Sequence, residues 1–134
     1  MDDVNKAAHR QPAFAEFLGL KVTSVSPERV TGELAAREEL NNRHGILHGG
    51  AIMALADNLG GTATTANLKP GQSTTTIESK TNFFAAVPIG DTAYAECVAL
   101  HRGRTTMVWQ TRITRGDGRL CALVTQTQLV LNPK

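Results

Sequence analysis

Residues 42–57 read NRHGILHGGAIMALAD, and this stretch sets the expectations for both the fold and the chemistry of the chain. Gly49 and Gly50 precede a run of six apolar residues that ends at Asp57. A carboxylate after such a run must be desolvated or paired with a partner. Glycines that open a helix leave backbone N–H groups accessible to a ligand. The stretch therefore predicts a helix that carries an active site.

Apolar residues recur every three or four positions after His48: Ile52, Leu55, Ala56, Leu59 and Ala63. This spacing is typical of one face of an amphipathic helix, which we expect to run from His48 to about Leu68. Gly49 and Gly50 would then lie in its first turn. Unpaired N–H groups and the positive end of the helix dipole make that turn a candidate oxyanion-binding site.

The helix itself predicts how many chains build the site. Gly50 and Asp57 lie on nearly the same face of the helix, but about 10 Å apart along its axis. One carbonyl carbon cannot contact both. If Asp57 attacks, or activates water against, a carbonyl that the glycine amides hold, two antiparallel copies of the helix must each supply one half. We therefore expect a homodimer with two equivalent, shared active sites.

Each site residue also has a structural interpretation when it is taken alone. His48 could cap the helix or lie in the core, and Asp57 could be a solvated helix residue. Asn42 follows another asparagine and could be an ordinary turn residue. The functional interpretation depends on their joint spacing around the glycine pair.

Taken together, these residues resemble the hotdog-fold acyl-CoA thioesterases, in particular the phenylacetate-degradation (PaaI-type) branch. The residues that carry the resemblance are Asn42, Gly45, His48-Gly49-Gly50, Asp57, Asn82-Phe83, Gly90-Asp91, His101 to Thr105 and Gln126 to Gln128. The resemblance implies hydrolysis of an acyl- or aryl-CoA thioester, with Asp57 as nucleophile or general base. It also implies that Asn42 orients the water or thioester and that His48 holds the turn or assists the leaving sulfur. A homotetramer is expected.

One departure from the family concerns the strand after the long helix. Where some relatives carry a serine, this chain has Ala85, so we expect a hydroxyl that helps to position water to be missing. Thr64 and Thr65 are candidates to replace it, although threonines on helices beside strands are usually structural.

The rest of the chain predicts an α+β fold with five to six strands. Strand-like segments cover residues 20–25, 29–34, 74–84, 92–101, 105–114 and 120–131. A short helix is expected over residues 12–18, ending at Gly19, and residues 1–11 are expected to form a flexible N-terminus. Short connections after residue 101 join antiparallel neighbours, so we expect a curved antiparallel sheet wrapped around one long central helix.

Composition limits the classes of function. The 134 residues suffice for one domain, residues 1–134. A net charge of +2, from 14 basic and 12 acidic residues, is too balanced for a nucleic-acid-binding protein. No run approaches the roughly 18 apolar residues of a membrane-spanning helix, and the N-terminus lacks the apolar core of a signal peptide. We expect a soluble, cytoplasmic protein with no nucleic-acid or membrane partner.

The remaining reactive residues give weaker signals. Cys97 and Cys121 each lie in a strand pattern, so we expect buried thiols. The four histidines lack zinc-ligand spacing, so neither a metal nor a cofactor is expected. Arg102 and Arg104 flank a turn glycine, where they could bind the phosphates of CoA or simply be solvated.

The aromatic residues and the function each have two interpretations. Phe83, Phe84 and Trp109 could line a pocket, although we expect them mainly in the core. A non-catalytic module that binds acyl-CoA is the alternative function. Such a module would need the glycine turn but not an acid on the same face, so Asp57 favours an enzyme.

Overall fold

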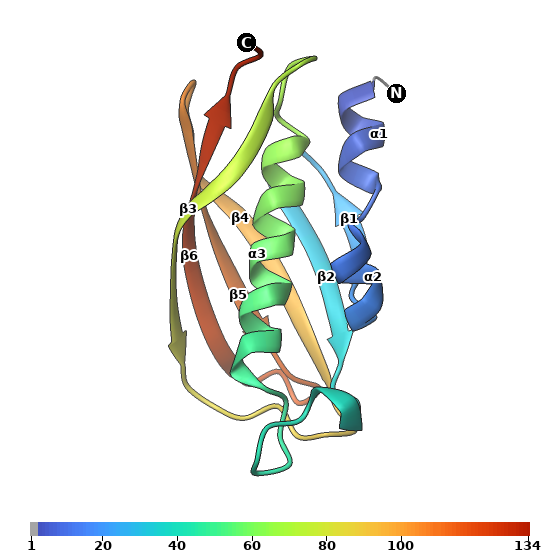
Figure 1. The fold of residues 1–134 in the computed structure, drawn as a ribbon. Helices are drawn as coiled ribbons and strands as arrows, with labels where there is room; N and C mark the ends of the chain where they lie inside the picture. The colour runs from blue at the N-terminus through green and yellow to red at the C-terminus, as the bar shows by residue number, and fades with distance from the viewer. Residues whose placement is uncertain (1–2) are drawn as a thin grey trace.

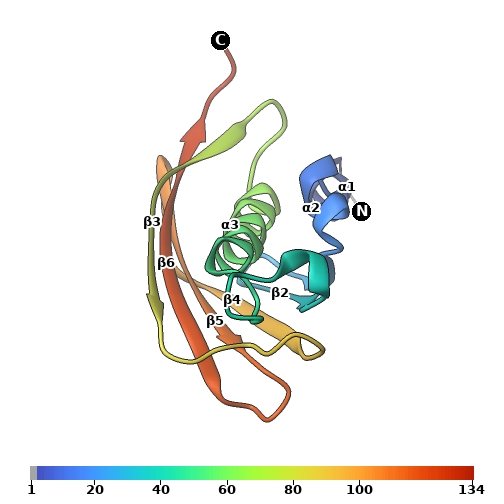
Figure 2. The ribbon, with the colours of Figure 1, turned by 60° about the horizontal axis from the view of Figure 1, so that its bottom comes forward.

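Helix α3 covers Gly49–Thr65 and lies along the concave side of a curved antiparallel sheet (Figure 1) (Figure 2). The computed structural model describes residues 3–134. The α3 residues that recur at helical spacing, including Leu55, Leu59 and Ala63, are fully buried against the sheet. The expected amphipathic helix around which the sheet curves is therefore confirmed.

Helix α3 ends at Thr65, three residues before the predicted end at Leu68. The Asn67 side chain donates one hydrogen bond to the Ala63 carbonyl, at 2.9 Å, and one to the Pro27 carbonyl, at 2.8 Å. The amide thereby satisfies a carbonyl in the last turn, which would otherwise lack a partner. The chain then leaves the helix axis.

Six strands form the sheet, in the spatial order β1-β2-β4-β5-β6-β3, and every neighbouring pair is antiparallel. Their bounds are Lys21–Val25 (β1), Arg29–Ala35 (β2), Ser73–Phe83 (β3), Thr92–Arg102 (β4), Thr106–Thr114 (β5) and Leu120–Leu131 (β6). All six predicted strands are present, with ends within about one residue of the prediction. The sheet places β3, the strand after α3, at an edge.

A bulge interrupts the pairing of β3 with β6. Thr76 lies opposite Gln128 and Glu78 lies opposite Thr127, so Ile77 is an extra residue in β3. On the N-terminal side of the bulge, Thr76 faces α3. On the C-terminal side, Phe83 lies opposite the buried Ala122, so it faces the same side of the sheet.

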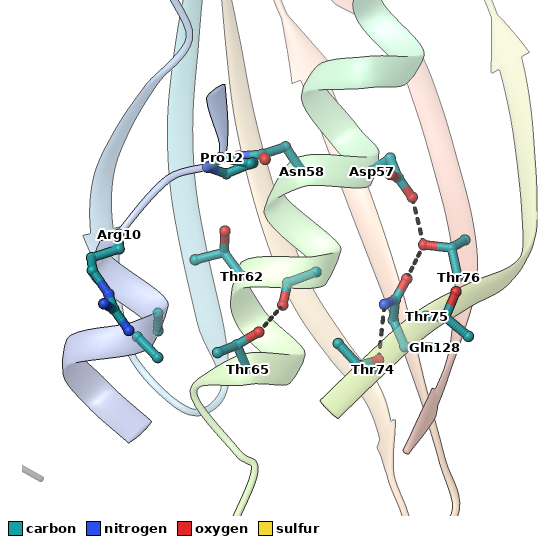
Figure 3. Close-up of a pocket in the computed structure, with 13 residues that line it drawn as sticks. Arg10, Pro12, Asp57, Asn58, Thr62, Thr65, Thr74, Thr75, Thr76 and Gln128 are labelled. Carbon is teal, nitrogen blue, oxygen red and sulfur yellow. Dashed lines mark hydrogen bonds between the residues drawn. The ribbon is translucent and has the colours of Figure 1, made fainter. Parts of the chain in front are cut away.

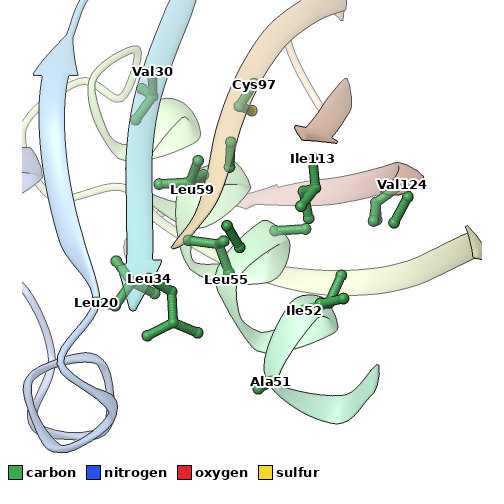
Figure 4. Close-up of a cluster of buried hydrophobic side chains, with 14 of the residues drawn as sticks. Leu20, Val30, Leu34, Ala51, Ile52, Leu55, Leu59, Cys97, Ile113 and Val124 are labelled. Carbon is green, nitrogen blue, oxygen red and sulfur yellow. The ribbon is translucent and has the colours of Figure 1, made fainter. Parts of the chain in front are cut away.

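The core fills the space between α3 and the concave face of the sheet (Figure 4). Leu34 from β2, Cys97 from β4 and Ile113 from β5 meet α3 there. Trp109 is also fully buried, and its indole N–H donates to the Thr64 hydroxyl at 2.9 Å. Trp109 therefore lies in the core as expected. Cys97 and Cys121 are buried free thiols, also as expected.

The N-terminal segment contains a helix that was not predicted. Within residues 1–11, which were expected to form a flexible N-terminus, Asp3–His9 form helix α1, while residues 1–2 lie outside the described residues. Ala8 is fully buried, and the side-chain oxygen of Gln11 accepts a hydrogen bond of 2.7 Å from the Asn58 side chain of α3. These contacts hold the segment in place. The predicted short helix follows as α2, Ala13–Leu18, with Gly19 in a left-handed conformation.

A short 3-10 helix, η1, covers Glu38–Leu40 and was not predicted. Within residues 3–134, the helices are all too short or too polar to cross a membrane.

Candidate active site

His48 and Gly50 close the first turn of α3. The predicted glycine pair opens the helix, and His48 is the N-cap residue, whose ring Nδ1 accepts a hydrogen bond of 2.8 Å from the Gly50 N–H. An imidazole nitrogen that accepts carries no proton, so the neutral ring has its proton on Nε2. The predicted capping role of His48 is thus observed, and Gly50 does not offer a free amide.

Gly49 retains the free amide of this turn. Within the part of the chain that the structure describes, its N–H has no hydrogen-bond acceptor. The backbone that precedes Gly49 is held in place, because the His48 N–H donates to the Leu40 carbonyl at 2.8 Å and the Leu47 N–H donates to the Val87 carbonyl at 2.9 Å. The structure therefore narrows the candidate oxyanion donors from two glycines to Gly49.

A hollow of about 300 Å³ lies beside Gly49. Its walls include Phe83 and Phe84, which are 52% and 55% exposed in the single chain. The expectation that these two rings lie in the core is wrong, because both are largely exposed where β3 ends at Phe83. A Cβ atom on Gly49 would come within 3.2 Å of the Phe83 ring. Glycine at position 49 thus leaves room between the ring and the free amide.

Asn42 shapes the loop next to this hollow. Its side-chain oxygen accepts hydrogen bonds from the N–H groups of His44, at 2.8 Å, and Ile46, at 3.3 Å. This arrangement is that of an ordinary turn residue. Asn42 also lines the hollow beside Gly49, with its side-chain nitrogen unused by these two bonds.

Asp57 lies two turns further along α3 and is exposed. Its Oδ1 accepts a hydrogen bond of 2.7 Å from the Thr76 hydroxyl of β3 and one of 3.3 Å from the Gln126 amide of β6. The carboxylate is therefore paired rather than desolvated. Figure 3 shows Asp57 directed from α3 toward Thr76, whose hydroxyl also hydrogen-bonds to the side-chain oxygen of Gln128.

A second hollow, of about 480 Å³, opens at Asp57 between α3, β3 and the segment that joins α1 to α2 (Figure 3). Hydroxyl and amide side chains dominate its walls, including Thr62, Thr65, Thr76 and Gln128. This hollow has no lining residue in common with the one beside Gly49. One chain thus holds the acid and the free amide in separate places, as the helical spacing predicts.

Thr76 is a site residue that the sequence prediction missed. The chain was expected to lack a hydroxyl because of Ala85, but Ala85 lies in the hollow beside Gly49, whereas Thr76 contacts Asp57. Thr64 donates to the Gly60 carbonyl at 2.8 Å and Thr65 to the Gly61 carbonyl at 2.8 Å, so neither hydroxyl replaces it at Asp57. A threonine-rich edge strand gave no signal, because threonine is common in strands.

The basic turn lies at the other end of α3. Arg102 and Arg104 line a hollow of about 400 Å³ together with Asn67 and Lys69, which follow the helix. Arg102 donates a hydrogen bond of 3.3 Å to the Asn67 side-chain oxygen, and both arginines are exposed. Among residues 3–134, no three His, Cys, Asp or Glu side chains lie close enough together to hold a metal ion.

The surface beside Asp57 exposes apolar side chains and a free strand edge. The outward face of α3 carries Gly50, Met53 and Asp57, all exposed. Beside it, β3 has a free edge along its 11 residues, and Ile77 is 57% exposed there. Long free edges with apolar side chains are prone to pair with another strand.

Comparisons with known proteins give a consistent result. Residues 44–122 match the family model described as the thioesterase superfamily. The chain is 30% identical over 109 residues to 1,4-dihydroxy-2-naphthoyl-CoA hydrolase of Listeria monocytogenes, covering 81% of this chain and 87% of that protein.

Solved structures are also similar. The crystal structure of AziG from S. sahachiroi has a TM-score of 0.87 at 28% identity, and the similarity covers 92% of this chain and 99% of that one. The PaaI protein from the phenylacetic acid degradation operon of E. coli has a TM-score of 0.86 at 22% identity, covering 96% of this chain and 91% of that one. The PaaI likeness concerns the fold.

Proposed function

This chain belongs to the thioesterase superfamily and is a thioesterase, and we propose that it hydrolyses an acyl- or aryl-CoA thioester with Asp57 and the Gly49 amide as its catalytic groups. The expected resemblance to hotdog-fold thioesterases is confirmed. The observation that carries the proposal is the pair of unused groups on α3: the Gly49 N–H has no acceptor, and Asp57 Oδ2 has no donor among the described residues.

The two groups have complementary roles in this proposal. The Gly49 N–H donates to the thioester oxygen and stabilises the negative charge that develops on it. One such donor contributes roughly 3–4 kcal/mol in other enzymes. His48 Nε2–H, on the neighbouring ring, is the second donor available at this turn, either to the same oxygen or to the departing sulfur.

Asp57 promotes attack on the thioester carbon by one of two routes. As a general base, its carboxylate takes a proton from water while the water oxygen bonds to the thioester carbon. The C–S bond then breaks as that proton passes to the sulfur, which releases CoA as the thiol and restores the carboxylate. As a nucleophile, Asp57 displaces the thiolate to form a mixed anhydride, which water hydrolyses to the free acid. Thr76 holds the carboxylate in both routes.

We propose that two chains complete each site. Pairing of two β3 edges around a two-fold axis would continue the sheet and set the two α3 helices antiparallel. Asp57 of one chain would then approach Gly49 of the other. The exposed Met53 and Ile77 would be covered by the partner. A tetramer of two such dimers stays a prediction.

The two ends of the substrate have candidate hollows. The one at Asp57 is lined mainly by hydroxyl and amide groups, which favours a short acyl or aryl group with polar substituents over a long aliphatic chain. Arg102 and Arg104 are the candidate groups for the CoA phosphates, because guanidinium groups bind phosphate in a bidentate manner.

The proposal is tested by replacing the acid. Asp57→Asn keeps the shape of the side chain but can act neither as base nor as nucleophile, so kcat should fall by at least about 10²-fold. The assay is thiol release from a panel of short, medium-chain and hydroxylated aryl-CoA thioesters, with binding followed by calorimetry. Full activity in a folded Asp57→Asn variant would remove Asp57 from the chemistry. Binding without turnover across the whole panel in the wild type would favour the binding module.

The shared site is tested by complementation. Gly49→Val would place a bulky side chain between the free amide and Phe83, while the acid of the same chain stays intact. A mixed dimer with Asp57→Asn would contain one doubly defective site and one intact site. Co-expression should therefore restore up to roughly a quarter of wild-type activity when pairing is random. No recovery in verified mixed dimers would mean that both groups come from one chain.

A further inference from the structure

Gln126 is a fully buried amide on β6, directly beneath α3. Its side chain lies against Gly60, three residues after Asp57, and a Cβ atom on Gly60 would overlap the amide. Glycine is among the least favourable residues in a helix interior, so its presence needs a reason. The reason here is the close approach of Gln126, which could not pass beneath any larger residue.

Both hydrogens of the Gln126 amide are used. Nε2 donates to Asp57 Oδ1 at 3.3 Å and to Gln128 Oε1 at 3.1 Å. The opposite atom, Oε1, is buried and has no partner within the described part of the chain. Turning the amide over would place Oε1 against Asp57 Oδ1 and Gln128 Oε1, and both of these atoms only accept hydrogen bonds. The donors therefore face the acid, although a buried acceptor stays unsatisfied.

The result at Asp57 is an asymmetric carboxylate. Oδ1 accepts from both Thr76 and Gln126, whereas Oδ2 receives no hydrogen bond from residues 3–134. The Thr76 hydroxyl, whose single proton Gln128 Oε1 can also accept, and the Gln126 amide are thus both placed at Oδ1. Oδ2 is left as the oxygen that can react.

We propose that Gln126 is a positioning residue for hydrolysis: it holds Asp57 through Oδ1, so that Oδ2 is the oxygen that attacks the thioester or takes a proton from water. This inference depends on the function proposed for Asp57. It explains together the helix glycine, the buried amide and the orphaned oxygen. Gln126 needs no contact with the substrate to act in this way.

The first test is Gln126→Met, which keeps the length of the side chain and removes the donors. A misplaced reacting group lowers the rate by about 10- to 100-fold, so we expect kcat to fall in that range. KM should stay within about twofold, because the contacts with the substrate are unchanged. Thr127→Val is the matched control on the same strand. Its hydroxyl contacts Glu78 at 3.4 Å, away from Asp57, so kcat should not change.

The second test uses the helix side of the same contact. Gly60→Ala should displace the Gln126 amide and lower kcat as Gln126→Met does. Alanine adopts the same helical backbone conformation as the glycine it replaces. In a Gln126→Ala background, the space is empty, so Gly60→Ala should leave kcat as it is and raise Tm. This non-additivity identifies the contact as the cause. Additive losses of kcat would instead mean that the two positions act independently.

The outcomes separate this inference from the proposed function. If Asp57→Asn is inactive while folded Gln126→Met retains the wild-type kcat, Gln126 does not position the acid and only this inference is overturned. A rise in KM equal to the fall in kcat would also overturn it, since that pattern indicates a binding role. If Asp57→Asn is fully active, both fail.

Discussion

The two faces of α3 differ in what they do for the molecule. The face toward the sheet carries Leu55, Leu59 and Ala63, all fully buried, and packs against the core (Figure 4). The outward face carries Gly50, Met53 and Asp57, all exposed in one chain. One helix thus separates stability from chemistry by its 3.6-residue period. A side chain changed on one face should leave the property of the other face nearly intact.

The largest expected effect lies on the buried face. Leu59→Ala should lower the free energy of unfolding by about 2–5 kcal/mol, because it removes a fully buried side chain and leaves a cavity. The kcat of the folded fraction should change little. Urea unfolding followed by circular dichroism measures the first quantity and thiol release the second. Leu100→Ala, at a position that is 56% exposed, is the matched control and should cost less than about 1 kcal/mol. Equal losses in the two variants would contradict the difference in burial.

Cys97 provides a test of the same buried region by pH. Burial raises the pKa of the Cys97 thiol to about 11, from 9.0. The folded state favours the neutral thiol. The stability that this preference contributes is therefore fully present below about pH 9 and is lost as the pH rises through about 11. The loss amounts to about 2–3 kcal/mol. The free energy of unfolding of the wild type should fall by most of this amount between pH 8.5 and 10.5, and Cys97→Ala should not show this fall. Parallel losses in both proteins would exclude Cys97 as the source.

His48 lies where the two faces meet, at the start of the helix. His48→Ala removes the acceptor of the Gly50 N–H and should lower the free energy of unfolding by about 1 kcal/mol. His48→Asn restores an N-cap acceptor but has no Nε2–H. We expect it to recover the stability, while kcat stays about tenfold below wild type. Recovery of both would assign His48 to capping alone.

The smallest expected effect concerns the basic turn beyond the helix. Replacing Arg102 and Arg104 with alanine should raise KM for CoA thioesters by roughly tenfold, because two charge-assisted contacts with phosphate are lost. KM for a short thioester that lacks the nucleotide should stay the same. Steady-state kinetics with both substrates makes the comparison. An equal change in the two KM values would indicate an ordinary solvated turn.

Much of this architecture is predictable because it depends on periodicity. The α3 repeat and the six strand-like segments each follow a pattern set by burial on one side, and the turns between them contain glycine or proline. Helix α1 was missed because its sequence, DVNKAAH, has no amphipathic repeat, and its position depends on contacts with α3. Tertiary contact, not local preference, fixes that segment.

The candidate site divides in the same way. Asp57 and the glycine pair could be found because their spacing on one helix has a geometric meaning. The capping of Gly50 by His48 was one of several possible roles, because the side-chain rotamer that decides it does not follow from the sequence. Gln126 did leave a signal, since it lies two residues after the buried Val124 in β6, on the same face of the strand, and therefore places an amide on an apolar face. Its partner at Asp57 lies 69 residues away in sequence, which no local pattern reveals.

The bulge at Ile77 decides which residues of β3 face α3. Residues 76 and 83 are seven positions apart, so a regular strand without the bulge would direct them to opposite sides of the sheet. The extra residue shifts the alternation by half a period. Thr76 can then contact Asp57 while Phe83, seven residues later, reaches Gly49 on the same side. Regular pairing of the same residues beyond Thr76 would therefore bring Asn82, in place of Phe83, opposite Ala122 and toward the start of the helix, and homologous chains can be compared only in register with this position.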